Sequence, residues 1–235
     1  MEQHELQRRF AGLTTAHLAD ACLRAHIPVR CAPWPMNAAV PGSRVAGRVL
    51  PARHAGSVDI FLEAIDGAEP GDVLVVDNGG RADEACVGDL VVLEAQAAGL
   101  AGIVIWGLHR DSADIQAIGL PVFSLGTLPT GPLRLDPRPE GALASATVGE
   151  WTVDHGDLVL GDDDGVLFLP AARAGEILGL AETIRDTERA QAARIRAGEP
   201  LRSQLGFSGY LAERRLAPAP TFREYLRRVG GAIEE

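Results

Sequence analysis

The chain has 235 residues and a formal net charge of −10 at pH 7; 46% of its residues are hydrophobic and only 5% are aromatic. This size and composition allow one sizeable core built from Ala, Val, Leu and Ile. The negative charge argues against general nucleic-acid binding, which requires a basic face.

The cysteines and the N-terminal residues indicate a reducing compartment. Cys22, Cys31 and Cys86 show no C-x-x-C spacing and cannot all pair within one chain, so reduced thiols are expected. The opening residues MEQHELQRRF lack the basic and apolar regions of a signal peptide. No segment approaches the roughly 18 consecutive apolar residues of a membrane span. We therefore expect a cytoplasmic protein that binds no membrane.

Taken in chain order, the sequence first predicts two short helices within residues 5–25, with Thr14 or Thr15 capping the second. A proline-rich loop at 26–42 is expected to shape the edge of a pocket or an interface. Apolar runs of strand length then alternate with helical stretches. Strands are expected at 44–52, 73–77, 102–106, 121–124, 143–148, 157–161 and 165–169, and helices near 57–66, 89–98, 112–118, 173–196 and 221–229.

Because strands alternate with helices in the middle of the chain and pair as hairpins later, the sheet should be mixed rather than purely parallel. We expect a single α/β domain over residues 1–200. Residues 201–235 should form a helical C-terminal extension that packs on a neighbouring subunit.

The spacing that carries most information is Asp89, twenty residues, then Arg110-Asp111. Asp89 opens a predicted helix, and Arg110-Asp111 follows the apolar run AGIVIWG at 101–107, which is typical of a buried strand. Ligands of α/β sheets gather at the carboxyl ends of strands and at helix N-termini, where free N–H groups favour anions. Both halves of the pattern therefore point to one site for a small α-keto acid and a divalent metal.

Each piece also has a structural interpretation that stays open at this point. Asp89 alone is typical of an N-cap, and Arg110-Asp111 alone is typical of a solvated loop or of a cap for a helix beginning near Ser112. Together they suit a hard cation that keeps several waters beside one carboxylate, with Arg110 as a two-pronged donor to a carboxylate or enolate oxygen.

Other patterns exclude competing chemistries. Asp162-Asp163-Asp164-Gly165 lacks the ligand spacing of a calcium loop and predicts a tight turn between strands. Gly79-Gly80 is not followed by G-x-G-x-x-G, which argues against a nicotinamide cofactor. No Ser or Cys has a convincing nucleophile context, and the chain contains no lysine, which excludes a Schiff-base aldolase.

Five further segments occur around this pattern: LTTAHLADA at 13–21, PGSRVAGRV at 41–49, PGDVLVVDNGG at 70–80, IGLPVFSLG at 118–126 and HGDLVLGDDDGVLFLP at 155–170. In this order they resemble the class II pyruvate aldolases typified by 4-hydroxy-4-methyl-2-oxoglutarate/4-carboxy-4-hydroxy-2-oxoadipate aldolase, and the related regulator of ribonuclease activity A. The resemblance covers roughly residues 12–200. It implies a single-domain layered α/β sandwich with a mixed sheet, of the swivelling β/β/α kind.

The resemblance also implies roles for individual residues. Asp111 would be the direct ligand of Mg²⁺ or Mn²⁺, Arg110 would bind the pyruvyl group and stabilise its enolate, and Asp89 would orient a metal-bound water that acts as acid and base. The substrate carboxylate would be held by four backbone amides, those of Gly88, Asp89, Leu90 and Val91. The expected reaction is retro-aldol cleavage of a 4-hydroxy-2-oxo acid, with decarboxylation of oxaloacetate through the same enolate.

Two alternatives accompany this expectation. The regulator branch of the family lacks the complete pattern that this chain has, yet a non-catalytic protein that binds a partner such as a ribonuclease remains the second hypothesis. The chain also departs from the aldolases at Trp106-Gly107 and at His109. Trp106 is interpreted as a half-buried ring under the site or as a group that narrows the pocket, and His109 as a partly exposed loop residue or a proton relay. The resemblance suggests a homotrimer or homohexamer.

Overall fold

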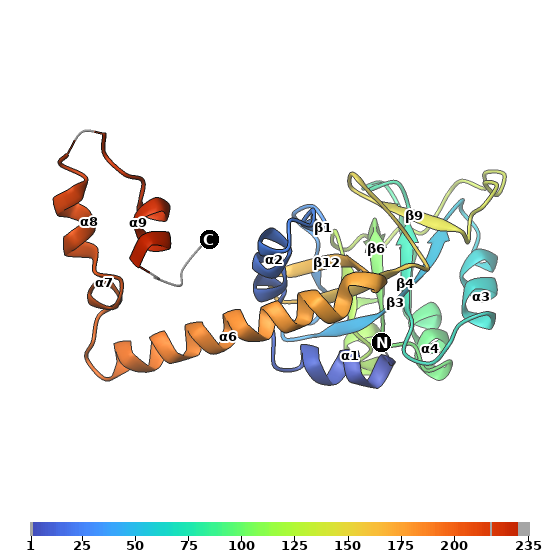
Figure 1. Cartoon of the computed structure of the whole chain (residues 1–235). Coiled ribbons are helices and arrows are strands. Elements are labelled where there is room, and N and C mark those ends of the chain that lie inside the picture. The colour runs from blue at the N-terminus through green and yellow to red at the C-terminus, as the bar shows by residue number, and fades with distance from the viewer. Residues whose placement is uncertain (1, 217, 230–235) are drawn as a thin grey trace.

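The computed structural model describes residues 2–216 and 218–229, and within them eight strands form one sheet in the order β1-β12-β11-β3-β4-β6-β8-β2 (Figure 1). Their bounds are Arg30–Cys31 (β1), Asn37–Ala38 (β2), Val45–Arg53 (β3), Val73–Asp77 (β4), Gly102–Trp106 (β6), Val122–Ser124 (β8), Asp157–Asp162 (β11) and Gly165–Pro170 (β12).

The sheet is mixed, as the sequence predicts. Strands β3, β4, β6 and β8 run parallel to one another, whereas β11 pairs antiparallel with both β3 and β12. The turn between β11 and β12 places Asp162 opposite Gly165, which confirms the predicted tight turn. Buried Asp162 also accepts hydrogen bonds from the backbone N and the Oγ1 of Thr15, at 2.8 and 2.6 Å, and so fastens the start of α2 to the sheet.

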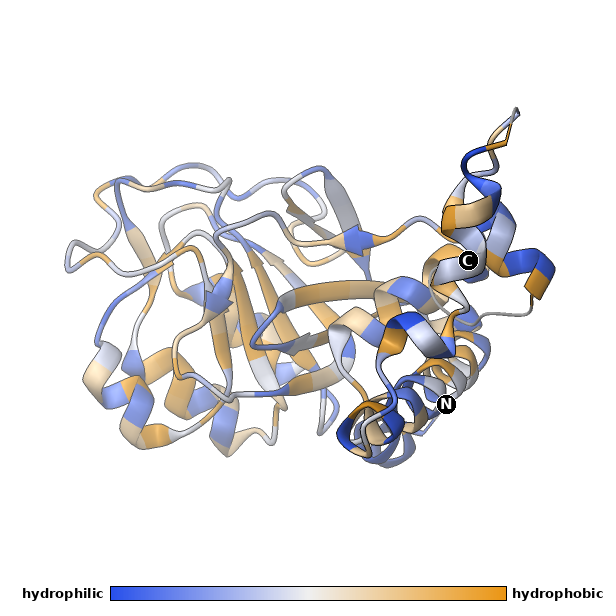
Figure 2. Ribbon diagram, turned by 90° about the vertical axis from the view of Figure 1, so that its left-hand side faces the viewer, coloured by the Kyte–Doolittle hydropathy of each residue, from blue (hydrophilic) through white to orange (hydrophobic). Residues whose placement is uncertain are grey.

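Alternation along the strands separates the two faces of the sheet. On β3, Ala46, Leu50 and Ala52 face the helices, while Val45 and Val49 face a second, smaller sheet. This smaller sheet is the hairpin of β9 (Ser145–Val148) and β10 (Trp151–Asp154). The result is a layered β/β/α arrangement in which apolar residues concentrate on the central strands (Figure 2).

Six helices cover the helical face of the sheet within the described residues. Helices α3, α4 and α5 pack on its parallel half, and α1, α2 and the first half of α6 pack on its antiparallel half. Thr14 caps α2, because its side chain accepts from the backbone N of His17, which confirms one of the two predicted caps. The bounds are Gln3–Phe10 (α1), Thr15–Arg24 (α2), Asp59–Asp66 (α3), Asp89–Ala97 (α4), Ser112–Ile118 (α5) and Ala174–Arg196 (α6).

One expectation about secondary structure is corrected. The segment 26–42 is not only loop, because it contains β1 and β2, which pair at opposite edges of the sheet while Met36 packs against the core between them. The strand expected at 143–148 is confirmed as β9 (Ser145–Val148), which pairs with β10 in the small sheet. The parallel pair β5 (Ala85–Val87) and β7 (Leu108–His109) was not predicted, because strands of two or three residues carry no usable periodicity.

The second half of α6 extends away from the body and leads to a C-terminal arm, residues 197–216 and 218–229 (Figure 1). The arm contains α7 (Leu201–Gln204), α8 (Phe207–Glu213) and α9 (Phe222–Val229), of which the sequence predicted the last. It has its own apolar cluster, formed by Leu205, Phe207, Tyr210, Phe222, Tyr225 and Leu226. Residues 230–235 of the predicted extension lie outside the described part of the chain. In that described part, no helix combines the length and the apolar character needed to cross a bilayer.

Candidate active site

The fold brings the two halves of the Asp89, Arg110-Asp111 pattern together through the short β5–β7 pair. Val87 at the end of β5 lies opposite His109 at the end of β7, and the backbone N of Arg110 donates to the carbonyl of Val87 at 3.0 Å. Gly88 and Asp89 therefore lie directly beside Arg110 and Asp111. The sequence spacing predicted that these residues lie together. The structural cause is the pairing of β5 with β7, which the sequence did not reveal.

Asp111 has an unusual backbone conformation. Its φ of 60° and ψ of 41° lie in the left-handed region, which aspartate tolerates better than most residues. Although Asp111 occupies the N-cap position of α5, no side-chain capping bond is formed there among the described residues. Its Oδ2 instead lies 3.3 Å from Nε of Arg110, and 35% of its side chain is exposed. A helix cap is therefore not a sufficient account of this carboxylate.

Gly88 allows the close approach of these charged groups. A Cβ at this position would lie 2.5 Å from Asp111 Oδ2 and 3.3 Å from Arg110 Nε. On the other side of the guanidinium, a Cβ at Gly131 would lie 2.7 Å from Arg110 Nη1. The Arg110 side chain thus passes between two glycines, whose missing side chains leave it room beside the backbone.

Helix α4 begins at the same place. Gly88 is its N-cap and Asp89 its first helical residue, and no side-chain cap bond is found at this terminus within the described chain. The interpretation of Asp89 as a simple N-cap is therefore wrong. The first-turn N–H groups of an α-helix have no intrahelical acceptor, so the amides of Asp89, Leu90 and Val91 are available to an anion.

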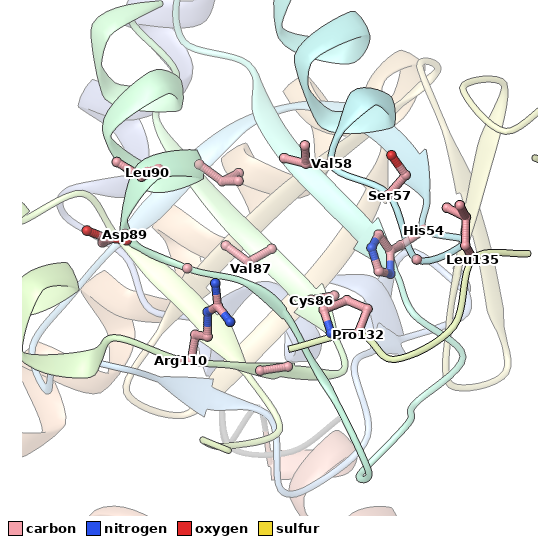
Figure 3. Close-up of a pocket in the computed structure, with 14 residues that line it drawn as sticks. His54, Ser57, Val58, Cys86, Val87, Asp89, Leu90, Arg110, Pro132 and Leu135 are labelled. Carbon is pink, nitrogen blue, oxygen red and sulfur yellow. The ribbon is translucent and has the colours of Figure 1, made fainter. Parts of the chain in front are cut away.

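Arg110 lines two pockets, one on each side of its side chain. The larger, of about 450 Å³, contains the start of α4 and the residues drawn in Figure 3; it is lined by His54, Gly56, Ser57, Val58, Ala85, Cys86, Val87, Gly88, Asp89, Leu90, Val91, Arg110, Pro132 and Leu135. The smaller, of about 260 Å³, is lined by Arg110, Asp111, Ser112, Thr127, Leu128 and Pro129. Segment 26–42, all of which is described, contributes no residue to either pocket. The expectation that it shapes the pocket edge is therefore wrong for these two pockets.

Only some of the predicted side chains point into the larger pocket. The guanidinium of Arg110 extends into it toward Val87, whereas the carboxylate of Asp89 points away from its centre (Figure 3). Val91 is buried in the first turn of α4, whereas Leu90 lines the pocket but is 74% exposed. The Leu90 side chain is apolar, so only the backbone amide of this residue can bind an anion.

His54 is a pocket residue that the sequence analysis missed. It follows directly after β3, at the same carboxyl edge of the parallel strands as Arg110, and that position was the available signal. The residue is buried, its ring stacks on Phe61 at 5.2 Å, and Nδ1 lies 2.9 Å from Oδ1 of Asn78. Burial lowers the pKa of His54 below its ordinary value, and the nearby positive charge of Arg134 adds to this effect.

Two departures from the aldolase pattern can now be placed. His109 is 3% exposed, with Nδ1 2.8 Å from Ser124 Oγ, so the expectation of a partly exposed loop histidine is wrong. Burial removes the water that an exposed loop would offer, and it lowers the pKa of the His109 imidazole. Trp106 is half-buried, as expected, and packs against the turn at Gly80, where an added Cβ would lie 2.9 Å from the indole.

The donor set can be compared with the needs of a hard divalent cation. Among the described residues, no three His, Cys, Asp or Glu side chains converge on a possible metal position. Asp111 would therefore be the sole side-chain ligand, which fits an ion such as Mg²⁺ that keeps several waters and binds through one carboxylate and substrate oxygens. A thiol-bound metal does not fit, because burial raises the pKa of the one pocket cysteine, Cys86, to about 12.

Several known proteins resemble this chain in sequence or in fold. A protein of Halalkalibacterium halodurans named "Putative 4-hydroxy-4-methyl-2-oxoglutarate aldolase" is 32% identical over 125 residues, which are 52% of this chain and 57% of that protein. The matched region thus spans little more than half the length of that relative. A crystal structure from Pseudomonas syringae superposes with a TM-score of 0.73 at 27% identity, covering 86% of this chain and 96% of the other.

A second solved structure is that of Streptomyces coelicolor RraAS2, described as an unusual member of the RNase ES inhibitor RraA protein family. It has a TM-score of 0.69 at 27% identity, over 81% of this chain and 98% of that one. The family model RraA-like, described as Aldolase/RraA, matches residues 15–168 and so includes every strand that builds the pocket. This chain therefore belongs to the Aldolase/RraA family.

Proposed function

We propose that the protein is a divalent-metal-dependent lyase that cleaves a 4-hydroxy-2-oxo acid to pyruvate or a related 2-oxo acid. The observation that carries the proposal is the convergence of the α4 N-terminus, the Arg110 guanidinium and the Asp111 carboxylate around Gly88. The aldolase name of the Halalkalibacterium relative supports the same reaction class.

The chain's own groups can meet the charges of this reaction. The N–H groups at the start of α4 would bind the substrate carboxylate, because the helix N-terminus is electropositive. Arg110 would donate to the keto oxygen, where negative charge develops as the bond beyond C3 breaks. A divalent cation held by Asp111 would supply Lewis-acid stabilisation of the same oxygen.

Proton transfer to C3 of the enolate is assigned to a water oriented by Asp89. The Asp89 side chain lies at the pocket rim, and this role requires the carboxylate to turn inward from the orientation in Figure 3. Decarboxylation of oxaloacetate passes through the same pyruvate enolate, so it is expected as a side activity of the same groups.

The test uses pyruvate itself and needs no knowledge of the natural substrate. With Mg²⁺ in deuterated solvent, we expect the protein to exchange the methyl protons of pyruvate, as followed by proton NMR. Exchange should stop with excess chelator and in Asp111→Ala, and should fall sharply in Asp89→Asn. The matched control is Asp164→Ala, an exposed aspartate in the β11–β12 turn that should leave the rate unchanged.

The second candidate is a non-catalytic regulator that binds a protein, and the RraA name of a structural neighbour supports it. A regulator that only retains the fold would show no exchange above the background of the metal ion alone. An unchanged methyl signal with metal-loaded protein at high concentration would therefore refute the lyase proposal and favour this candidate.

A further inference from the structure

The larger pocket has two chemically different ends. One end holds the α4 amides and Arg110, which suit an anion. The opposite end is formed by His54, Ser57, Val58, Pro132 and Leu135. In Figure 3 the imidazole of His54 is turned toward the interior of the pocket, on the side facing Val87 and Arg110. Apart from His54 and Ser57 this end is apolar, so these two side chains supply its hydrogen-bonding groups, and His54 is the only one of the two that can act as a base near neutral pH.

The hydrogen-bond network fixes the tautomer of His54. Oδ1 of Asn78 lies 2.9 Å from His54 Nδ1 and also accepts from Nη2 of Arg134 at 2.9 Å. Because a guanidinium can only donate, the amide must present its oxygen to both neighbours. Nδ1 of His54 therefore carries the proton and donates it to Asn78. In this tautomer Nε2 carries a lone pair, and no hydrogen bond to it is found among the described residues, so it can accept one.

Two carboxylates hold Arg134 in position. Arg134 donates to Oε1 of buried Glu84 at 3.0 Å and pairs with Asp136 at 2.6 Å. The charged groups acting on His54 are thus Arg134, which disfavours the imidazolium, and Glu84 and Asp59, which favour it. Burial is the largest influence on the pKa of His54 and outweighs the hydrogen bond to Asn78 and the two carboxylates, so the pKa lies below its ordinary value and the neutral imidazole is favoured near pH 7. A neutral, oriented imidazole with a free Nε2 has the properties of a general base.

We propose that His54 is a further catalytic residue, whose Nε2 takes the proton of the substrate's 4-hydroxyl group. This inference rests on the proposed function. As the O–H bond breaks, its electron pair forms the C4=O double bond of the carbonyl product. The C3–C4 bond breaks at the same time, and its electrons form the enolate of pyruvate. The imidazolium then releases its proton to solvent, while C3 takes one proton from the water assigned to Asp89.

If His54 is the base, its loss should affect only one of the three reactions that one site would share. Only aldol cleavage contains a hydroxyl proton to remove, whereas pyruvate exchange and oxaloacetate decarboxylation do not. For His54→Gln we expect kcat/KM for cleavage of 4-hydroxy-4-methyl-2-oxoglutarate to fall on the order of 10²–10⁴-fold. Mg²⁺-dependent pyruvate exchange and oxaloacetate decarboxylation should stay near wild-type rates. The control is His155→Gln, an exposed histidine that contacts the carbonyl of Leu143.

The pH profile of the wild-type protein is a second measurement that needs no variant. Protonation removes the base, so kcat/KM for cleavage should fall as pH drops through the pKa of His54. Because that pKa is lowered, the fall should lie below pH ~6.5, the ordinary value for histidine. Decarboxylation should lack this limb, and the His54→Gln variant should lose it for cleavage.

The following outcomes would contradict the assignment of His54 as the base. Equal loss of all three reactions in His54→Gln would assign His54 a structural role, and unchanged cleavage would remove it from the mechanism. If this variant does not fold, matching pH profiles for cleavage and decarboxylation overturn the proposal. Wild-type protein that exchanges pyruvate but cleaves no 4-hydroxy-2-oxo acid also overturns it. If the wild type neither exchanges pyruvate nor decarboxylates oxaloacetate, the proposed function itself fails.

Discussion

At the scale of single residues, Arg110 combines charge with shape. Its guanidinium passes between Gly88 and Gly131, and Nε lies 3.3 Å from Asp111 Oδ2. Nearly half of the side chain is exposed, so a bound substrate could still reach the remaining donors. A planar fork can contact a carboxylate or enolate at two points, which a lysine ammonium cannot do.

We therefore expect Arg110→Ala to lower the turnover of oxaloacetate decarboxylation on the order of 10²–10³-fold, the typical effect of removing an electrostatic stabiliser. Arg110→Lys should keep the charge but lose the planar two-pronged donor. Its turnover should therefore lie between those of the wild type and of Arg110→Ala. Steady-state kinetics with Mg²⁺ checks both. The matched control is Arg173→Ala, an exposed arginine of the 3₁₀ turn before α6 that pairs with Glu176. An Arg110→Ala rate close to that of the parent would mean that the site lies elsewhere.

At the scale of elements, the junction between β5 and α4 determines how close the charged groups approach. Gly88 has φ −128° and ψ −175°, a conformation that any residue adopts, so its importance is steric rather than conformational. An added methyl group would meet Asp111 Oδ2, which would have to move away from the start of α4.

Gly88→Ala should therefore lower pyruvate exchange and oxaloacetate decarboxylation strongly while the melting temperature changes little. The comparison is Gly175→Ala in α6, where an added Cβ meets nothing within 4 Å. That change should leave activity alone and stabilise the helix slightly. Full activity in Gly88→Ala would show that the Asp111 carboxylate need not lie against this junction.

At the scale of the whole molecule, we propose that two exposed regions form subunit contacts. The first lies beside the pocket and contains exposed apolar residues of the α3 region, of α4 and of the loop after β8: Val58, Leu62, Leu90, Leu93, Leu133 and Leu135. The second is the C-terminal arm, which carries exposed Leu211 and Leu216 and stands away from the body (Figure 1). Exposed apolar patches of this kind mark interaction surfaces in soluble domains.

We expect a homotrimer or homohexamer whose active sites lie at subunit boundaries. Light scattering at micromolar concentration should report such an oligomer, and truncation after Gly198 should weaken it before the core unfolds. Leu62→Glu, on the exposed side of α3, should weaken contacts beside the pocket without removing the arm. A monomeric wild-type protein would contradict both expectations.

The sequence alone determined the mixed sheet, the helices α4 and α5, the long helix α6 and the Asp89, Arg110-Asp111 pattern. These features are local or repeat with a clear period: apolar runs of strand length, helical periodicity, a threonine cap and a two-residue turn. The same reasoning failed for 26–42, because strands of two residues exist only where a sheet edge pairs with them.

The tertiary structure decided which further side chains share the pocket with the predicted Asp89 and Arg110. His54 is separated from Asn78 by 24 residues and from Arg134 by 80, and no spacing rule joins them. The β5–β7 pair brings Gly88 to Asp111, and burial rather than sequence position makes His54 a neutral base candidate and His109 a core residue. Such properties depend on desolvation and on long-range contacts, which form only when the strands come together.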